Sequence, residues 1–342
     1  MHIVGLFPEE IENWLKERQI ASFRAEQIFS WLHRHAIDDF SKMTNLPREV
    51  ITQLQDEFGS VWPLELVDCR VSKDGTEKYL FSLGDGTSIE SVLIPDEPRQ
   101  TLCISTQVGC AMGCSFCATG RSGYTRNLTA AEIVAQVLWV ESRLKTLGKS
   151  ISNIVYMGMG EPLANYEAVM GSLQLLNHPK GLNLGARRLT ISTCGLVPQI
   201  RALAEEEIQV NLAISLHAVD DAKRSEVMPV NRRYPISELM AACDEYTEKT
   251  GRRISYEYAL IRGFNDHQGE AQALRDLLRG RLCHVNLIPI NPVGEVERPS
   301  PRSVAEFAKV LEAGQIPVSI RKERGTDIEA ACGQLRQTHL QE

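Results

Sequence analysis

The chain has 342 residues, of which 43% are hydrophobic and 24% charged, so it can bury a full globular core. No apolar run approaches the roughly 20 residues of a membrane span and the N-terminus has no signal-peptide core, so we expect a cytoplasmic protein with no membrane partner. The net charge of −7 argues against indiscriminate nucleic-acid binding. Basic pairs near strand ends could still form a local phosphate-binding face, or they could be ordinary solvated charges. The pairs are Arg187–Arg188, Lys223–Arg224, Arg232–Arg233, Arg252–Arg253 and Arg321–Lys322.

The first 98 residues divide into a helical part and a strand-rich part. The apolar spacing within residues 8–57 is typical of short amphipathic helices, which predicts a helical accessory domain over residues 1–60. Residues 63–94 alternate apolar and polar positions around two glycine turns. This pattern predicts a small antiparallel β extension over residues 61–98 that leads into the core.

From about residue 100 the pattern changes to alternating strands and helices. Strand-like runs occur at 101–107, 152–158, 188–193, 208–216, 253–260, 283–290 and 316–320. Helical segments at 129–147, 236–249, 266–280 and 302–313 separate most of them. This alternation predicts a parallel sheet with crossover helices, in units too few for a closed eightfold barrel. We therefore predict an α/β fold, a partial (β/α)6 barrel over residues 99–335, with its chemistry at the C-terminal strand ends.

Four of the nine cysteines lie close together in the chain. Cys110, Cys114 and Cys117 form a C-x3-C-x2-C loop after the first predicted strand, and three thiolates at this spacing can hold three corners of a [4Fe–4S] cluster. The fourth iron would then be open to a substrate. Two alternatives remain: Cys103 could complete a four-ligand zinc site, and Cys114 with Cys117 also forms the C-x-x-C of a redox pair. The scattered cysteines are interpreted as structural: Cys69, Cys194, Cys243 and Cys283.

Later strand ends carry further candidates for a ligand pocket. The glycines beside Glu161, in the run MGMGEP at the end of the second strand, permit close backbone approach, and Glu161 can accept a hydrogen bond from a ligand amine. Single polar residues recur at the ends of the next strands, where each is as readily a structural group. They are Ser192 in LTISTCG, Ser215 and His217 in AISLHA, and Asn291 in NLIPINP.

A three-cysteine loop after the first strand of a partial barrel resembles the radical SAM superfamily. The resemblance implies that S-adenosylmethionine chelates the fourth iron of the cluster and is cleaved to a 5′-deoxyadenosyl radical. It implies that Phe116, just before the last cysteine, lines the adenine pocket, and that Gly160 and Glu161 bind the methionyl amine. The other cofactor contacts that it implies are Ser192, Ser215, Leu216, His217 and Asn291.

A closer resemblance covers essentially the whole chain. Its motifs include FRAEQIFSWLH at 23–33, SIESVLIP at 88–95, TLCISTQVGCAMGCSFCATG at 101–120, YMGMGEPLANY at 156–166 and RKERGTDIEAACGQL at 321–335. They are similar to those of the methyl synthases that methylate the C2 carbon of an adenine in 23S ribosomal RNA and in tRNA. A sister branch methylates C8 of the same adenine, confers antibiotic resistance and shares the cysteines, so it is the alternative. The stretch RGTDIEAACGQL looks more like the C2 branch.

This resemblance implies roles for three residues outside the triad. Cys332 would accept a methyl group from one S-adenosylmethionine, and a second, cleaved at the cluster, would yield the radical that activates this methyl for addition to C2. Glu90 would remove the C2 proton, and Cys103 would attack the sulfur of Cys332, which releases the product and leaves a disulfide. On the residues alone, Glu90 is an ordinary exposed strand residue and each cysteine a small buried hydrophobe, although a glycine-flanked loop thiol is exposed enough to react.

The implied partners are 23S rRNA, tRNA and an external electron donor that reduces the disulfide, and we expect a monomer. The target adenine must leave its stack to reach a buried cluster, and the N-terminal helices and basic pairs are candidates for phosphate contacts. Two other classes compete with this interpretation. One is a radical SAM enzyme acting on a protein or metabolite, which has no need for Cys103, Cys332 and Glu90 together. The other is a zinc-stabilised RNA-binding protein without catalysis.

Overall fold

The computed structural model describes residues 2–291 and 297–335, and one sheet of ten strands runs through it. Seven of these strands are neighbours and pair in parallel. In sheet order they are β4 (Arg99–Cys103), β7 (Asn153–Tyr156), β8 (Leu189–Thr193), β9 (Asn211–Ser215), β10 (Ile254–Leu260), β11 (Cys283–Pro289) and β12 (Val318–Ile320). The predicted partial barrel is confirmed, and every predicted strand run from 152 to 320 contains one of its strands.

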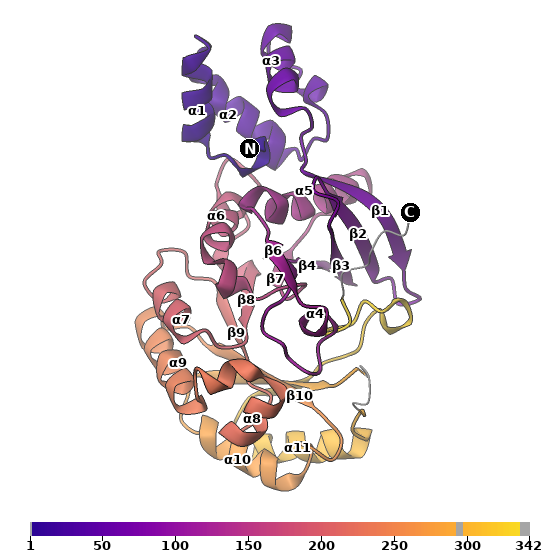
Figure 1. The fold of residues 1–342 in the computed structure, drawn as a ribbon, viewed down its shortest axis with the longest axis vertical. Coiled ribbons are helices and arrows are strands. Elements are labelled where there is room, and N and C mark those ends of the chain that lie inside the picture. Colours follow the sequence, from indigo (N-terminus) through magenta and orange to yellow (C-terminus); the bar gives the residue numbers. More distant parts are fainter. Residues whose placement is uncertain (1, 292–296, 336–342) are drawn as a thin grey trace.

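Helices connect consecutive parallel strands and cover the outside of the sheet (Figure 1). They are α4 (Ala118–Arg121), α5 (Ala130–Thr146), α6 (Tyr166–Asn177), α7 (Val197–Leu203), α8 (Asp221–Val227), α9 (Ile236–Thr250), α10 (Gln268–Leu278) and α11 (Pro301–Ala313). Strand burial alternates because one face packs under the helices and the other faces the inside of the barrel. In β8, Ile191 is fully buried while its neighbour Ser192 is only half-buried, on the inner face.

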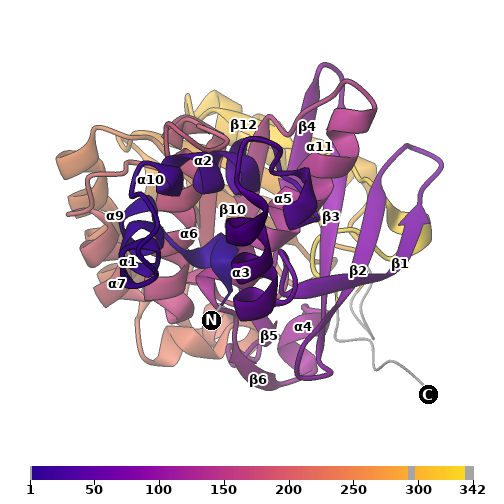
Figure 2. The same ribbon diagram turned by 90° about the horizontal axis from the view of Figure 1, so that it is seen from above.

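The predicted β extension forms three antiparallel strands, β1 (Leu64–Val71), β2 (Glu77–Leu83) and β3 (Ser88–Asp96). They continue the barrel sheet, because β3 pairs antiparallel with β4 and places Val92 opposite Cys103. The extension and the barrel therefore share one sheet. Figure 2 shows β1 and β2 projecting to one side of the molecule, beside the yellow C-terminal segment.

The N-terminal helices are α1 (Pro8–Glu17), α2 (Arg24–Phe29), a π-helical turn (Ser30–Arg34) and α3 (Arg48–Phe58), with short 3-10 turns at Ile3–Gly5 and Phe40–Lys42. Figure 1 places α1, α2 and α3 at one end of the molecule, next to α5 and α6. The turn at Ile3–Gly5 contacts both α5 and α6, and the buried side chains of this region belong to the same hydrophobic core as the barrel. No described helix is long and apolar enough to cross a bilayer.

The first predicted strand, 101–107, is wrong in one respect: it divides into two strands of different sheets. β4 ends at Cys103, and β5 (Gln107–Gly109) pairs with β6 (Tyr124–Asn127) in a separate ribbon. Between them the buried Ser105 gives its backbone N–H to the Gln136 side chain of α5 at 2.9 Å, which turns the chain out of the main sheet. The cysteine loop therefore follows the ribbon strand β5 and not the barrel strand.

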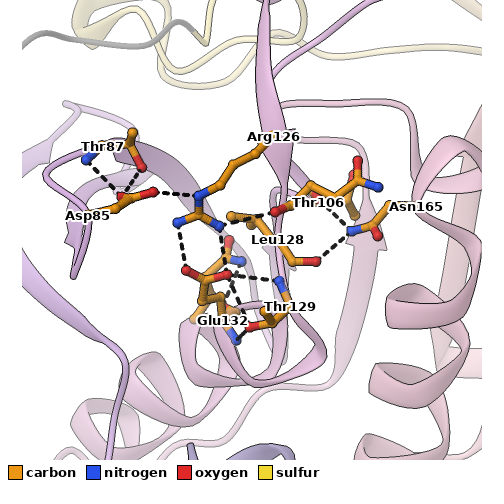
Figure 3. A network of polar contacts seen from close by, with 10 residues as sticks. Asp85, Thr87, Thr106, Arg126, Leu128, Thr129, Glu132 and Asn165 are labelled. Carbon is orange, nitrogen blue, oxygen red and sulfur yellow. Dashed lines mark hydrogen bonds and ion pairs between the residues drawn. The ribbon is translucent and has the colours of Figure 1, made fainter. Parts of the chain in front are cut away.

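Arg126 on β6 fixes this ribbon to the rest of the molecule (Figure 3). Its guanidinium binds both oxygens of Glu132 at 2.8 and 3.0 Å and Asp85, in the β2–β3 turn, at 2.5 Å. Arg126 holds the pKa of Asp85 well below its usual range. Glu132 also completes a capping box with Thr129 at the start of α5, so one carboxylate fixes both the ribbon and the helix.

Asn165 supports the other side of the ribbon, also shown in Figure 3. Its buried side-chain amide donates to the backbone carbonyls of Thr106 and Leu128 at 2.8 and 2.7 Å. These two carbonyls lie just before β5 and just after β6. A single amide therefore sets the spacing of the two chains from which the cysteine loop extends.

Candidate active site

A cavity of about 1040 Å³ opens at the C-terminal ends of the parallel strands. It brings together most of the residues that the sequence pointed to: Cys110, Cys114, Phe116, Cys117, Gly160, Glu161, Ser192, Ser215, His217, Asn291 and Cys332. Three predicted site residues do not line it: Glu90, Cys103 and Leu216. The motif NLIPINP contributes Asn291, and its last residue, Pro292, lies outside the described residues.

The three cysteines of the triad surround this cavity as free thiols. Burial raises the pKa of all three, to about 12 for Cys110, and each thiol is also affected by a neighbouring thiol. Buried thiolates that repel each other need a cation between them, which the irons of a cluster would supply. In the described part of the chain no three His, Cys, Asp or Glu side chains converge on a single ion. A cubane cluster needs no such convergence, because each cysteine binds a different iron. The triad therefore fits a cluster.

Backbone contacts hold the triad loop in place. The N–H of Cys110 donates to the carbonyl of Gly123 at 2.7 Å, and the N–H of Cys117 donates to the carbonyl of Cys114 at 3.2 Å. The N–H of Ser115 donates to the carbonyl of Val227, the last residue of α8, at 3.1 Å. The loop is thus fixed at its base by the ribbon and at its centre by a helix of the barrel.

Glu161 lies at the end of the MGMGEP run, beside two glycines that no other residue could replace. A Cβ on Gly160, whose φ is +103°, would lie 2.6 Å from the Cβ of Gln107, and a Cβ on Gly158 would lie 2.7 Å from the carbonyl of Ile104. The Glu161 carboxylate accepts backbone N–H groups from Leu163 at 3.0 Å and Cys194 at 2.8 Å. Burial raises its pKa. Each oxygen keeps a lone pair for a cationic ligand group.

His217 faces Phe116 across the cavity. The two rings meet edge to face with centroids 4.8 Å apart. The Nδ1 of His217 accepts the backbone N–H of Ala259 at 2.9 Å, and burial lowers the pKa of His217 to about 3, so the ring is neutral and fixed. Its φ of +60° is rare for a residue with a side chain. His217 therefore orients Phe116, while Leu216 beside it is fully buried in the core.

Cys332 is exposed on a C-terminal loop that closes over the triad. The carbonyl of Gly333 accepts the N–H of Ala118 at 2.8 Å, and Thr119 donates to the carbonyl of Leu335. Asn291 donates its side-chain amide to the carbonyl of Cys332 at 3.4 Å. Residues just after the triad thus bind both sides of the loop thiol.

The turn between β1 and β2 anchors the same loop from the other direction. Asp327 accepts the Ser72 hydroxyl at 2.5 Å and the Lys73 N–H at 3.3 Å. Asp74 accepts the N–H of Gly325 at 3.0 Å. The β extension, which looked like an accessory in the sequence, therefore positions Cys332.

Arg321, the residue after β12, lies between the two thiols outside the triad. Its side chain hydrogen-bonds with Cys332, and the thiols of Cys332 and Cys103, together with Glu257, raise the pKa of Arg321 against the opposing effect of burial. Burial and the neighbouring Cys332 raise the pKa of Cys103 to about 12, while Arg321 lowers it. The structure thus places Cys103 and Cys332 near one another with a guanidinium beside both.

Glu90 is only 2% exposed, so the expectation of an exposed strand residue is wrong. Its carboxylate pairs with Lys78 at 3.1 Å, and Lys78 also donates to the carbonyl of Glu329 in the C-terminal loop. β3 lies inside the sheet, and both of its faces are covered, which buries this position. Glu90 is two residues before Val92, and Val92 is paired with Cys103. Glu90 and Cys103 therefore share a face of the sheet.

The basic pairs do not form the single face that the sequence suggested. Arg187–Arg188 and Arg252–Arg253 precede β8 and β10, at the end of the barrel opposite the cavity. Arg224 is fully buried. Arg321–Lys322 alone among the pairs lines the grooves beside Cys332.

The sequence interpretation missed four residues at or behind the cavity: Cys194, Arg224, Glu257 and Arg321. For Arg224 and Arg321 the only signal was membership of a basic pair. Cys194 was interpreted as structural, yet it follows β8 directly and its backbone N–H binds Glu161. The position of Glu257 on β10, in line with the other strand ends, was the signal that could have found it.

Comparison with known proteins agrees with this site. Residues 104–273 match the family model of the radical SAM superfamily, and residues 1–58 match the N-terminal domain of ribosomal RNA large subunit methyltransferases. A solved radical SAM methyltransferase from Sphaerobacter thermophilus is 49% identical, with a TM-score of 0.96 over 98% of this chain and 99% of that one.

Curated relatives extend over nearly the whole chain. A protein of Clostridium perfringens (strain 13 / Type A), named "Probable dual-specificity RNA methyltransferase RlmN", is 47% identical over 99% of this chain and 97% of its own length. A protein of the same name from Heliobacterium modesticaldum is 49% identical over 97% of this chain and 88% of its own. The chain therefore belongs to the RlmN family of radical SAM RNA methyltransferases.

Proposed function

We propose that this enzyme methylates the C2 carbon of an adenine in 23S rRNA, and of an adenine in tRNA, through a methylated Cys332. The observation that carries the proposal is the exposed Cys332 thiol, held over the cluster cysteines and beside Cys103 and Arg321. The dual specificity in the names of the relatives supports two RNA substrates, and the C8 alternative finds no support among them. We further propose that the enzyme acts as a cytoplasmic monomer with an external electron donor.

Cys110, Cys114 and Cys117 would hold the [4Fe–4S] cluster, and Glu161 would bind the amine of S-adenosylmethionine at the open iron. Bound together, these two groups supply an electron and a carbon radical able to remove a hydrogen atom from an unactivated methyl group. Phe116, fixed by His217, would pack against the adenine. Gly160 allows the backbone to approach the ligand closely, which any side chain at that position would prevent.

Cys332 would act as the nucleophile that accepts a methyl group before RNA is modified. A thiolate is the reactive form, and the Arg321 guanidinium beside it favours that form. An aromatic C2–H is neither acidic nor nucleophilic, so a protein-bound methyl carrier is needed between the methyl donor and the base. The cavity gives the thiol access to the donor, and its exposure gives it access to RNA.

Glu90 would take the C2 proton, and Cys103 would release the product. The Lys78 ammonium keeps the Glu90 carboxylate ionised and oriented, as a base requires. Cys103 would attack the sulfur of Cys332, so that two thiols become one disulfide and the external donor restores them with two electrons. Arg321 favours the Cys103 thiolate, which burial otherwise disfavours.

The test is mass spectrometry of 23S rRNA and tRNA after anaerobic reaction of the reconstituted enzyme with S-adenosylmethionine and a reductant. We expect C2-methyladenosine with the wild type. We expect Cys332→Ala to form no methylated RNA but still to release 5′-deoxyadenosine. The half-buried Cys69→Ala serves as the matched control and should methylate normally. Methylated RNA from Cys332→Ala would exclude the role of this thiol, and a colourless zinc protein would exclude the cluster.

The N-terminal helices are our candidates for holding the RNA backbone. They carry exposed arginines such as Arg34 and Arg48, whereas the barrel end with α10 and α11 lies at the other end of the molecule (Figure 1). Phosphate contacts position an RNA without reading its sequence, so these arginines would set affinity and not the choice of base.

A further inference from the structure

Arg224 on α8 is the largest fully buried side chain among the described residues. Its guanidinium donates four hydrogen bonds of 2.7–3.1 Å. The acceptors are the carbonyls of Cys194, Ser215 and Leu216 and the side-chain oxygen of Asn231. All four acceptors are neutral, so these bonds satisfy the N–H groups but leave the positive charge uncompensated.

No carboxylate forms an ion pair with Arg224 in the described ranges of the chain. Asp221, the acid with the largest influence on it, directs its carboxylate oxygen to the amide of Asn231 and to the backbone N–H of Ile236 instead. Arginine stays protonated in proteins even when burial lowers its pKa. A buried, unpaired cation costs several kcal/mol, so an anion nearby is expected.

The triad loop lies directly against the helix that carries Arg224. The backbone of Ser115 is hydrogen-bonded to Val227, at the end of α8. The side chains of Val227 and Met228 pack with those of Cys114 and Cys194 in one apolar cluster. Cys194 and Cys114 are the two groups whose ionisation affects Arg224 most strongly, and Cys114 is a proposed cluster ligand.

We infer that Arg224 is the electrostatic partner of the cluster, a positioning residue whose buried charge favours the reduced cluster over the oxidised one. This inference rests on the cluster of the proposed function. Three thiolates around a cubane leave a net negative charge at the loop, and reduction adds one more. In a site of low dielectric, a fixed cation behind the loop stabilises the more negative state and so raises the reduction potential.

The same four hydrogen bonds give Arg224 a second effect that the test must separate from its charge. They connect the end of β8 to the end of β9, where Ser192 and Ser215 line the cavity. Loss of the side chain would therefore disturb the shape of the ligand pocket as well as the field at the cluster. A lysine keeps the charge with fewer donors, whereas a glutamine keeps donors without the charge.

The experiment is a redox titration of the anaerobically reconstituted full-length enzyme, followed by the EPR signal of the reduced cluster. We expect Arg224→Gln and Arg224→Met to shift the potential to more negative values, and Arg224→Lys to remain near the wild type. Arg201→Met, which removes an exposed guanidinium paired with Glu245 on the outside of the barrel, should leave the potential unchanged. If the methionine variant does not fold, the Gln and Lys pair alone decides.

An unchanged potential in Arg224→Gln, or an equal shift in Arg224→Lys, would overturn the inference and leave only a structural role for the side chain. Neither result affects the proposed function, because the wild type would still hold its cluster and methylate RNA. The proposed function fails separately, if the wild type takes up no iron and sulfide or leaves RNA unmethylated.

Discussion

At the level of single residues, the reactivity of Cys332 depends on the guanidinium beside it. Arg321 follows β12 and hydrogen-bonds with the thiol, while its own backbone N–H donates to Leu287 at 2.9 Å. β11 thus holds the arginine, and the arginine in turn faces a loop that would otherwise have only weak contacts with the barrel. The pairing of a fixed cation with an exposed thiol is typical of reactive cysteines.

We expect Arg321→Met to slow alkylation of Cys332 by iodoacetamide at neutral pH by roughly tenfold, because a charge-assisted hydrogen bond contributes about 1.5–3 kcal/mol. Peptide mass spectrometry measures the rate at Cys332 alone. Arg321→Lys should recover part of the rate. Arg324→Met, which removes a nearby cation at 3.7 Å from Asp96, is the control and should react like the wild type. Equal rates in all variants would contradict a role for Arg321.

The sequence identified most cavity residues correctly, because their types and spacing follow from chemistry that needs thiols, glycines and a carboxylate at strand ends. It was wrong about the exposure of Glu90, since the alternation of polar and apolar residues cannot show that a loop 240 positions later covers that face. It missed Arg224 and Arg321 because a basic pair looks the same whether it is solvated or buried.

At the level of elements, the β1–β2 turn acts as the support of the C-terminal loop. Burial would raise the pKa of Asp74, but the hydrogen bonds from Thr76, Gly325 and Ser72 outweigh it and hold the pKa at about 2. A carboxylate with a lowered pKa in the folded state stabilises that state above about pH 4 and loses this contribution as the pH falls toward 2.

We therefore expect the stability difference between the wild type and Asp74→Asn to be constant above pH 4 and to shrink toward pH 2. Because Asp74 is exposed, the difference should not exceed about 1 kcal/mol. Urea denaturation of the cluster-free protein at several pH values measures it. The exposed Asp276→Asn is a suitable control, and a difference that grows toward acid pH would contradict the assignment.

Arg126 makes the ribbon β5–β6 dependent on one side chain. We expect Arg126→Met to lower the free energy of unfolding by about 1–3 kcal/mol, because it leaves the largely buried Glu132 without its cation. Chemical denaturation measures the loss. Arg99→Met, which removes an exposed pair with Asp96, should cost no more than about 0.5 kcal/mol. Similar losses in both variants would show that the network carries no special stability.

The sequence predicted the parallel strands and long helices well, because their burial follows a simple period. It did not predict the ribbon, whose two strands have three and four residues and are held by Asn165 and Arg126 rather than by an apolar pattern. Its β extension was correct as strands but not as a separate unit, since strand pairing between β3 and β4 has no signal in either strand alone.

At the level of the whole molecule, an enzyme with a net charge of −7 must bind RNA through a local surface. We expect Arg34→Gln with Arg48→Gln to weaken RNA binding and to lower the dependence of affinity on salt by about one phosphate contact for each residue. Arg302→Gln, on α11 at the other end of the molecule, should change neither quantity. Binding measured by filter retention at several salt concentrations decides, and an unchanged slope in the double variant would move the RNA surface elsewhere.

The docking of the C-terminal loop joins Ser72 to Asp327, residues 255 positions apart. During synthesis the three triad cysteines leave the ribosome long before Cys332, so the nascent chain can close most of its sheet while the methyl-accepting thiol is still in the exit tunnel. A molecule at that stage has the means to generate a radical but no carrier for the methyl group. The enzyme therefore becomes competent to modify RNA only once its own translation has finished, and it cannot act on the ribosome that is making it.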